Sequence, residues 1–234
     1  MFERGEVVAA LADEVAALEE VLLGLSEADV VKQTRCVPWD VAALSVHTVG
    51  SLHQVSVALD GGPADPAAAL VSAAGYYSPR VRLSPEVDRA RVDGALERAE
   101  RRSDAAEPGR VLGGIQAELW PRLARVPKDR TLVTRHGDSM SVTEYLVTRV
   151  VESLLHGLDI ADALGREPWA GDRALDLVGE VLFGGADPEA LERILPGARG
   201  ANALDAVRVV TGRAPARVGR VVLAGAGVRV LALG

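Results

Sequence analysis

The stretch of sequence that most constrains the fold is SVTEYLVTRVVESLLHGLDIADALG, residues 141–165. Ser141 and Glu144 stand at the spacing of a capping box, in which two side chains cap the start of a helix reciprocally. Gly165 is typical of the residue that ends a helix. Between these signals the sequence predicts one long helix, which any fold of this chain must accommodate.

The preceding residues predict a helical bundle around it. Apolar residues recur at helical spacing from Glu6 to Leu23, and Asp40 is a good N-cap for a helix that stops at Asp60. Further helices are expected at about 85–102 and 108–126, and short strands within 127–140. Residues 61–85 form a long connection with room for one short helix. The natural architecture is a four-helix bundle with one long crossover.

After Gly165 the pattern changes to shorter elements. Short helices are expected at about 172–182, 188–194 and 203–210, and the β-branched residues around Gly225 and Gly227 predict a closing hairpin. The prediction is therefore a mainly α chain with two domains. Residues 1–165 form the bundle, and residues 166–234 form a small α+β domain that leans on it.

Charge and the opening segment bear on partners and location. The 234 residues hold 33 acidic against 26 basic side chains, a net charge of −7 that opposes non-specific binding to nucleic acid. Charges from Glu3 to Glu14 interrupt the opening segment, so it lacks the apolar stretch of a signal peptide or membrane span. We expect a cytoplasmic protein without nucleic-acid or membrane partners; monomer and homodimer both stay open.

Within the long helix, Arg149, Glu152, His156 and Asp159 fall on one narrow stripe, at spacings of three, four and three. One interpretation is a solvent-exposed face, with a surface ion pair between Arg149 and Glu152. The other is a ligand pair, because a Glu and a His four residues apart on a helix can reach one divalent ion. The stripe alone leaves both interpretations open.

A metal site needs a third ligand, and His47 is the best candidate. It lies about two turns into the helix that follows Asp40, with small residues on its side that let other groups come close. His53 and His136 are better explained as surface or structural histidines. The single cysteine, Cys36, supplies no CxxC pair and is expected to pack as a small apolar side chain. Two His and one Glu would leave a coordination position free, which is the catalytic zinc pattern.

Two segments, VPWDVAALSVHTVG and SVTEYLVTRVVESLLHGLDIADALG, resemble the signatures of the mycothiol-dependent maleylpyruvate isomerase branch of the DinB-like superfamily. In that pattern one helix carries a metal histidine, and a later helix has the motif T-R-x-x-E-x-x-x-H-x-x-D. The resemblance implies a DinB-like four-helix bundle through about residue 165. It also implies that the metal ligands are His47, Glu152 and His156.

The end of the chain is also similar to this family. ALDAVRVVTGRAP resembles the end of its sterol-carrier-like C-terminal domain, although residues 168–201 are too few for a full mixed sheet. By this resemblance Arg213 matches an arginine that holds an acidic substrate, and we expect it to be catalytic. Arg80 and Arg82 are expected to bind an acidic group of the electrophile or the thiol.

The resemblance implies a zinc ion, with nickel and iron as alternatives, and mycothiol as the thiol cosubstrate. A metal-bound thiolate would attack a small electrophile. Since the C-terminal domain is abbreviated, we favour a thiol transferase in detoxification or natural-product biosynthesis over the maleylpyruvate isomerase. A hydrolase that activates water and a non-catalytic, metal-stabilised binding protein are further alternatives.

Overall fold

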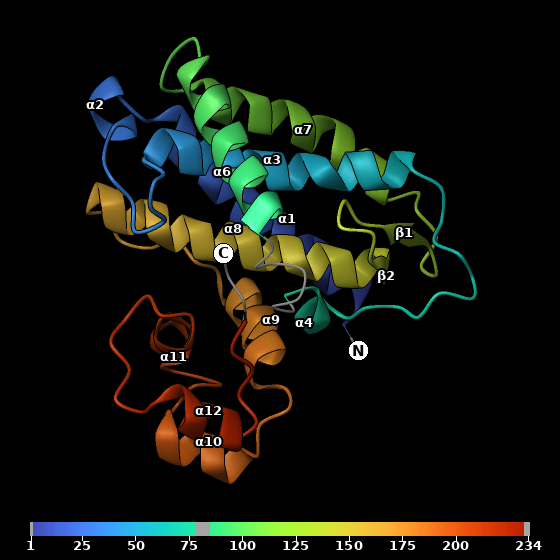
Figure 1. The fold of residues 1–234 in the computed structure, drawn as a ribbon, viewed down its shortest axis with the longest axis vertical. Helices are drawn as coiled ribbons and strands as arrows, with labels where there is room; N and C mark the ends of the chain where they lie inside the picture. The colour runs from blue at the N-terminus through green and yellow to red at the C-terminus, as the bar shows by residue number, and fades with distance from the viewer. Residues whose placement is uncertain (1, 78–84, 232–234) are drawn as a thin grey trace.

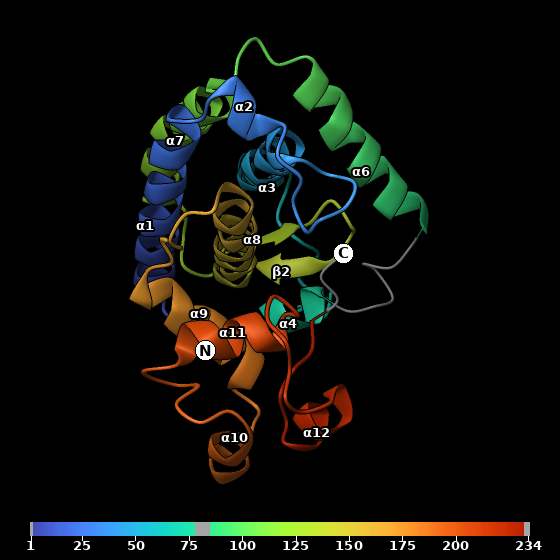
Figure 2. The same cartoon turned by 90° about the vertical axis from the view of Figure 1, so that its left-hand side faces the viewer.

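The computed structural model describes residues 2–77 and 85–231, and its centre is a bundle of four long helices (Figure 1). These are α1 (Arg4–Leu23), α3 (Val41–Asp60), α7 (Glu107–Leu123) and α8 (Val142–Leu164). α1 and α3 each pack against both α7 and α8, which closes the bundle. The mainly α prediction is confirmed. Shorter helices α2 (Glu27–Val30) and α4 (Ala73–Tyr76) lie in the connections, and α6 (Pro85–Glu100) packs against α3 on one side (Figure 2).

The residues predicted to cap or end the two central helices do so in the structure. The Asp40 carboxylate accepts a hydrogen bond from the Ala43 amide at 2.8 Å and caps α3. Ser141 caps α8 in the same way, and Gly165 ends that helix in the left-handed conformation at φ 67°. The capping box is only half formed, because the Glu144 carboxylate instead accepts a hydrogen bond from the Ala73 amide at 2.7 Å. This bond fixes α4 against α8.

The expected strands form a small hairpin directly before α8. β1 (Thr131–Val133) and β2 (Ser139–Ser141) pair antiparallel, with Thr131 opposite Ser141. Gly137 supplies a turn residue with φ 86°, a conformation that other residues rarely adopt. The hairpin sets the position at which α8 begins.

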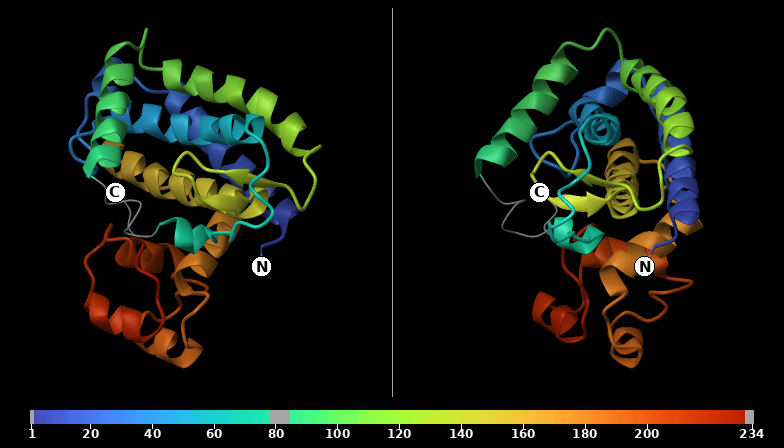
Figure 3. Two further views of the ribbon diagram at one scale, coloured as in Figure 1. Left: turned by 45° about the vertical axis from the view of Figure 1, so that its right-hand side comes forward. Right: turned by 90° about the vertical axis from the view of Figure 1, so that its right-hand side faces the viewer.

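The C-terminal region consists of α9 (Asp172–Phe183), α10 (Pro188–Ile194), α11 (Ala203–Val210) and α12 (Arg220–Gly225). α9 packs on α1 and α8, and α11 packs on α9. Figure 3 shows these helices on one side of the bundle. None of the described helices is long and apolar enough to cross a membrane.

The predicted closing hairpin is wrong. The residues before Gly225 form α12, and Val221 and Val222 on it are 86% and 50% exposed. Across the described residues 166–231 the chain forms helices and turns, so no strand lies beside this segment to complete a ladder. A helix instead satisfies backbone groups within the segment itself. The β part of the fold is therefore the β1–β2 hairpin.

Candidate metal centre

The polar stripe of α8 faces the interior of the protein. Arg149, His156 and Asp159 are 4%, 8% and 1% exposed, and the Glu152 side chain is 11% exposed. The solvent-face interpretation is therefore wrong. Burying four ionisable side chains on one helix is costly unless each finds a partner, so their contacts show what the stripe does.

The structure brings together the three residues expected to bind a metal. The Glu152 Oε2 atom lies 3.3 Å from His156 Nε2 and 3.8 Å from His47 Nε2. The two imidazole rings are 5.2 Å apart between centroids and nearly perpendicular. One ligand atom from each residue lies within 4.8 Å of the others. The contact joins α3 to α8 across the bundle.

His47 is held as a neutral imidazole. Its ring stacks on the buried Trp39 at 4.5 Å between centroids. Burial lowers the pKa of His47 to about 4, although the nearby Glu152 carboxylate acts in the opposite direction. A neutral imidazole offers a nitrogen lone pair at neutral pH, which is the form that binds a metal.

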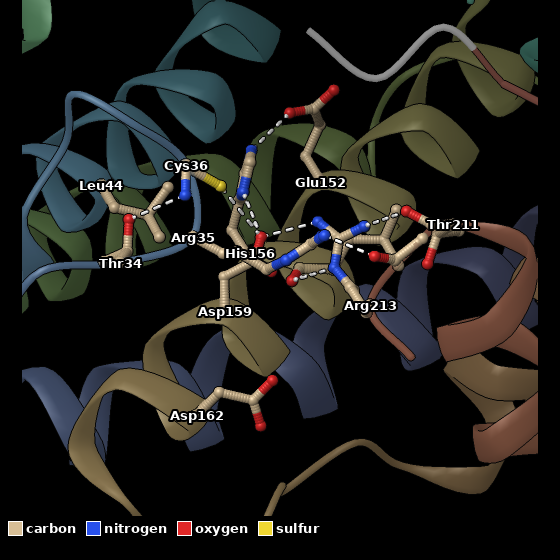
Figure 4. Close-up of polar contacts among 12 residues, drawn as sticks. Thr34, Arg35, Cys36, Leu44, Glu152, His156, Asp159, Asp162, Thr211 and Arg213 are labelled. Carbon is tan, nitrogen blue, oxygen red and sulfur yellow. Dashed lines mark hydrogen bonds and ion pairs between the residues drawn. The ribbon is translucent and has the colours of Figure 1, made fainter. Parts of the chain in front are cut away.

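His156 is oriented through its other ring nitrogen. His156 Nδ1 lies 3.3 Å from the Asp159 Oδ2 atom (Figure 4), so Nε2 is left facing Glu152. Burial acts to lower the pKa of His156, but hydrogen bonds to Asp159, Cys36 and Glu152 outweigh it and raise this pKa well above its ordinary value. A carboxylate behind a histidine is the usual arrangement around a protein-bound metal. Asp159 therefore points into the protein and holds the ring of His156.

Arg213 lies behind Asp159. Its guanidinium donates a hydrogen bond of 2.6 Å to the Asp159 Oδ2 atom and one of 3.3 Å to the Leu155 carbonyl, and its side chain is 4% exposed (Figure 4). Burial by itself raises the pKa of Asp159, but His156 and Arg213 together lower it to about 2. The predicted role of Arg213 toward an acidic substrate stays a prediction. In this structure its guanidinium is hydrogen-bonded to Asp159.

Cys36 lies nearer to the site than the sequence indicated. Its thiol donates a hydrogen bond of 3.3 Å to Asp159 Oδ2, and Cys36, His156 and Asp159 form a second group of possible ligands. The Arg213 guanidinium already occupies the same carboxylate oxygen, and its positive charge opposes a cation at that position. The group of His47, Glu152 and His156 is the better candidate centre.

The centre opens into a cavity of about 960 Å³ bounded by α3, α6, α7 and α8. His47 and Glu152 lie on its lining, together with the exposed His53 and with His136. Four lining arginines lie on α6 or directly after it and a fifth in the turn between β1 and β2, and we call this group the arginine wall: Arg91, Arg98, Arg101, Arg102 and Arg135. Arg80 and Arg82, which were predicted from the sequence to bind an acidic group of the electrophile or the thiol, lie outside the described residues.

The donor set fits a divalent metal. Two imidazoles and one carboxylate are typical protein ligands of catalytic zinc, which keeps a further position for a substrate or solvent molecule. Both histidines present Nε2 toward Glu152, but His47 is neutral there, whereas the raised pKa of His156 keeps a proton on Nε2 that a bound metal would displace. The cavity gives another molecule access to that point.

Fold and site together define a DinB-like helical-bundle protein with a candidate metal centre open to a cavity. Residues 11–161 match the family model described as mycothiol maleylpyruvate isomerase N-terminal domain, and the chain belongs to this family. The resemblance noted in the two sequence segments is thereby confirmed. Comparison with curated proteins and with solved structures gives no match.

Proposed function

We propose that this protein is a metal- and mycothiol-dependent thiol transferase whose metal is held by His47, Glu152 and His156. The observation that carries the proposal is the convergence of these three ligand atoms within 4.8 Å at a cavity, in a chain of a mycothiol family. A bound divalent metal such as zinc would lower the pKa of a ligating thiol and so supply a nucleophile. The protein's own cysteine is then not required as the nucleophile.

In this proposal the residues around the metal ligands have distinct positioning roles. Trp39 and Asp159 orient the imidazoles of His47 and His156, and Arg213 keeps Asp159 charged. We assign Arg213 a positioning role that reaches the centre through Asp159. The preorganised ligands lower the cost of assembling the reacting groups in one place.

The arginine wall supports an electrophile with an acidic group. Arg98 and Arg135 are exposed on the cavity lining and present guanidinium donors suited to a carboxylate or phosphate. In the reaction the thiol sulfur forms a bond to an electrophilic carbon. A leaving group then departs with its electron pair, or the neighbouring carbon of an unsaturated acid takes up a proton.

Maleylpyruvate isomerisation is the second candidate, because the matched family is described by that activity. The two reactions share the addition of sulfur and differ in its fate. An isomerase releases the thiol unchanged, whereas a transferase keeps it in the product.

Mass spectrometry of the products tests the proposal. Zinc-loaded protein is incubated with mycothiol and either an unsaturated acid or an alkyl halide. A thioether with consumption of thiol supports the transferase. A changed double-bond geometry with full recovery of thiol favours the isomerase. Turnover that continues at the same rate without any thiol would contradict both and favour a hydrolase.

A further inference from the structure

Tyr77 contacts the carboxylate of Glu152 on the side away from the histidines. Its hydroxyl lies 3.2 Å from Glu152 Oε1 and 3.0 Å from the Thr148 carbonyl. Glu152 Oε2 faces His156 Nε2 at 3.3 Å. Among the described contacts, one oxygen of this carboxylate faces a phenol and the other faces the histidines.

The packing of α4 on α8 fixes this contact. The Glu144 carboxylate holds the Ala73 amide at the start of α4, and Tyr77 follows the last residue of the same short helix. Glu144, Thr148 and Glu152 are four residues apart in turn, so α4 lies along a single face of α8. Tyr77 is 3% exposed, and its buried ring has little freedom to move away.

We propose that Tyr77 is a positioning residue that makes Glu152 a one-oxygen ligand to the metal. The inference rests on the proposed metal centre. The single phenol proton is shared between the Thr148 carbonyl and Glu152 Oε1, and its bond to Oε1 lowers the electron density available on that oxygen, so Oε2 is the better donor to a metal. A carboxylate that binds through one oxygen leaves room at the metal for the thiol. With both oxygens bound, the open position would be reduced.

Tyr77→Phe removes only the hydroxyl and tests this role through metal binding. We expect the zinc dissociation constant, measured by competition with a chromophoric chelator, to rise about tenfold. We also expect the visible bands of the cobalt-loaded variant to weaken, because a second carboxylate oxygen raises the coordination number. Tyr76→Phe is the matched control: its hydroxyl is also buried, but it accepts a hydrogen bond from Arg149 at 3.3 Å. This control should retain the zinc affinity and cobalt spectrum of the wild type.

A second pair of variants separates positioning from a general effect on folding. In a Glu152→Ala background no side-chain oxygen is left to accept the Tyr77 hydrogen bond, and Tyr77→Phe should then change zinc affinity less than twofold. An equal tenfold loss in both backgrounds would show that Tyr77 acts on the fold and not through Glu152.

The outcomes also separate this inference from the proposed function. If the wild type binds no zinc, the metal centre itself is wrong. If the wild type binds zinc and Tyr77→Phe has the same affinity and the same cobalt spectrum, only the role of Tyr77 is overturned.

Discussion

The base of the cavity is buried, whereas three of the five arginines of the arginine wall are exposed. At the base, Glu152, His156 and Asp159 are largely buried, and each contacts another polar side chain at 3.3 Å or less. On the wall, Arg98 is exposed, and Arg101 is 76% exposed with its nearest described ion-pair partner, Glu97, at 3.6 Å. Buried side chains that hydrogen-bond to one another keep a single geometry, while exposed arginine side chains can adapt to different ligands. The difference suggests that the base sets the chemistry and the wall selects the electrophile.

Loss of a ligand at the base should have the largest effect. We predict that His156→Ala removes bound metal and thiol-dependent activity while the bundle stays folded, as measured by elemental analysis and circular dichroism. His53→Ala, which alters an exposed histidine of the same cavity, should keep the metal. Full metal stoichiometry in His156→Ala would show that the ligand assignment is wrong.

Among these variants, loss of the buried ion pair between Asp159 and Arg213 should have the largest effect on stability. Arg213→Met leaves the Asp159 carboxylate buried with its closest cation removed, and we predict a loss of about 3–5 kcal/mol in unfolding free energy. Chemical denaturation measures this loss. The double variant Asp159→Asn with Arg213→Met should recover part of it. If the two single effects simply add, the 2.6 Å contact is not energetically coupled.

A second buried carboxyl group, that of Glu14, has its pKa shifted in the opposite direction from that of Asp159. Glu14 is 2% exposed and accepts a hydrogen bond from the Gly171 amide at 2.6 Å. Burial raises its pKa from an ordinary 4.5 to about 7, with the Gly171 bond acting against this and the Asp13 charge adding to it. Asp159, which faces Arg213, shows the opposite shift.

The raised pKa of Glu14 determines how the stability of the protein changes with pH. Between pH 4.5 and 7 the folded protein binds the Glu14 proton more tightly than the unfolded chain does. Stability from this group is therefore lost as pH rises through the window, by about 3 kcal/mol in total. The difference in unfolding free energy between Glu14→Gln and wild type should change by this amount from pH 4.5 to 7.5. A difference independent of pH would contradict the raised pKa.

The smallest effect is expected on the wall. Arg98→Met should lower the rate with an unsaturated acid about tenfold relative to its methyl ester, because one guanidinium contact to the carboxylate is lost. Zinc affinity should not change. Arg193→Met, an exposed site on α10, serves as control. An unchanged ratio of acid to ester rates in Arg98→Met would remove this residue from electrophile selection.

The sequence predicted those features that depend on local spacing. The helix starting after Ser141, its end at Gly165, and the alignment of Glu152 with His156 all follow from residues a few positions apart. His47 was chosen as the third ligand for its place on a helix beside small residues, and the family motif then supported it. Periodicity alone does not show which helices become neighbours.

The remaining contacts depend on long-range packing. Tyr77 and Glu152 are 75 residues apart in the sequence, and Cys36 and Asp159 are 123 residues apart. No periodic pattern in the sequence predicts contacts between residues so far apart. The hairpin near Gly225 was predicted from β-branched residues, but a strand also needs a neighbour, which the described part of this region does not provide.

The central claim is that the base of the cavity binds a metal that accepts a thiol. Titration of cobalt-loaded protein with mycothiol, and separately with glutathione, tests it most directly. We predict a sulfur-to-cobalt charge-transfer band that saturates at low mycothiol concentration and at a higher concentration of glutathione. Protein that holds cobalt and gives no such band with either thiol would contradict the account.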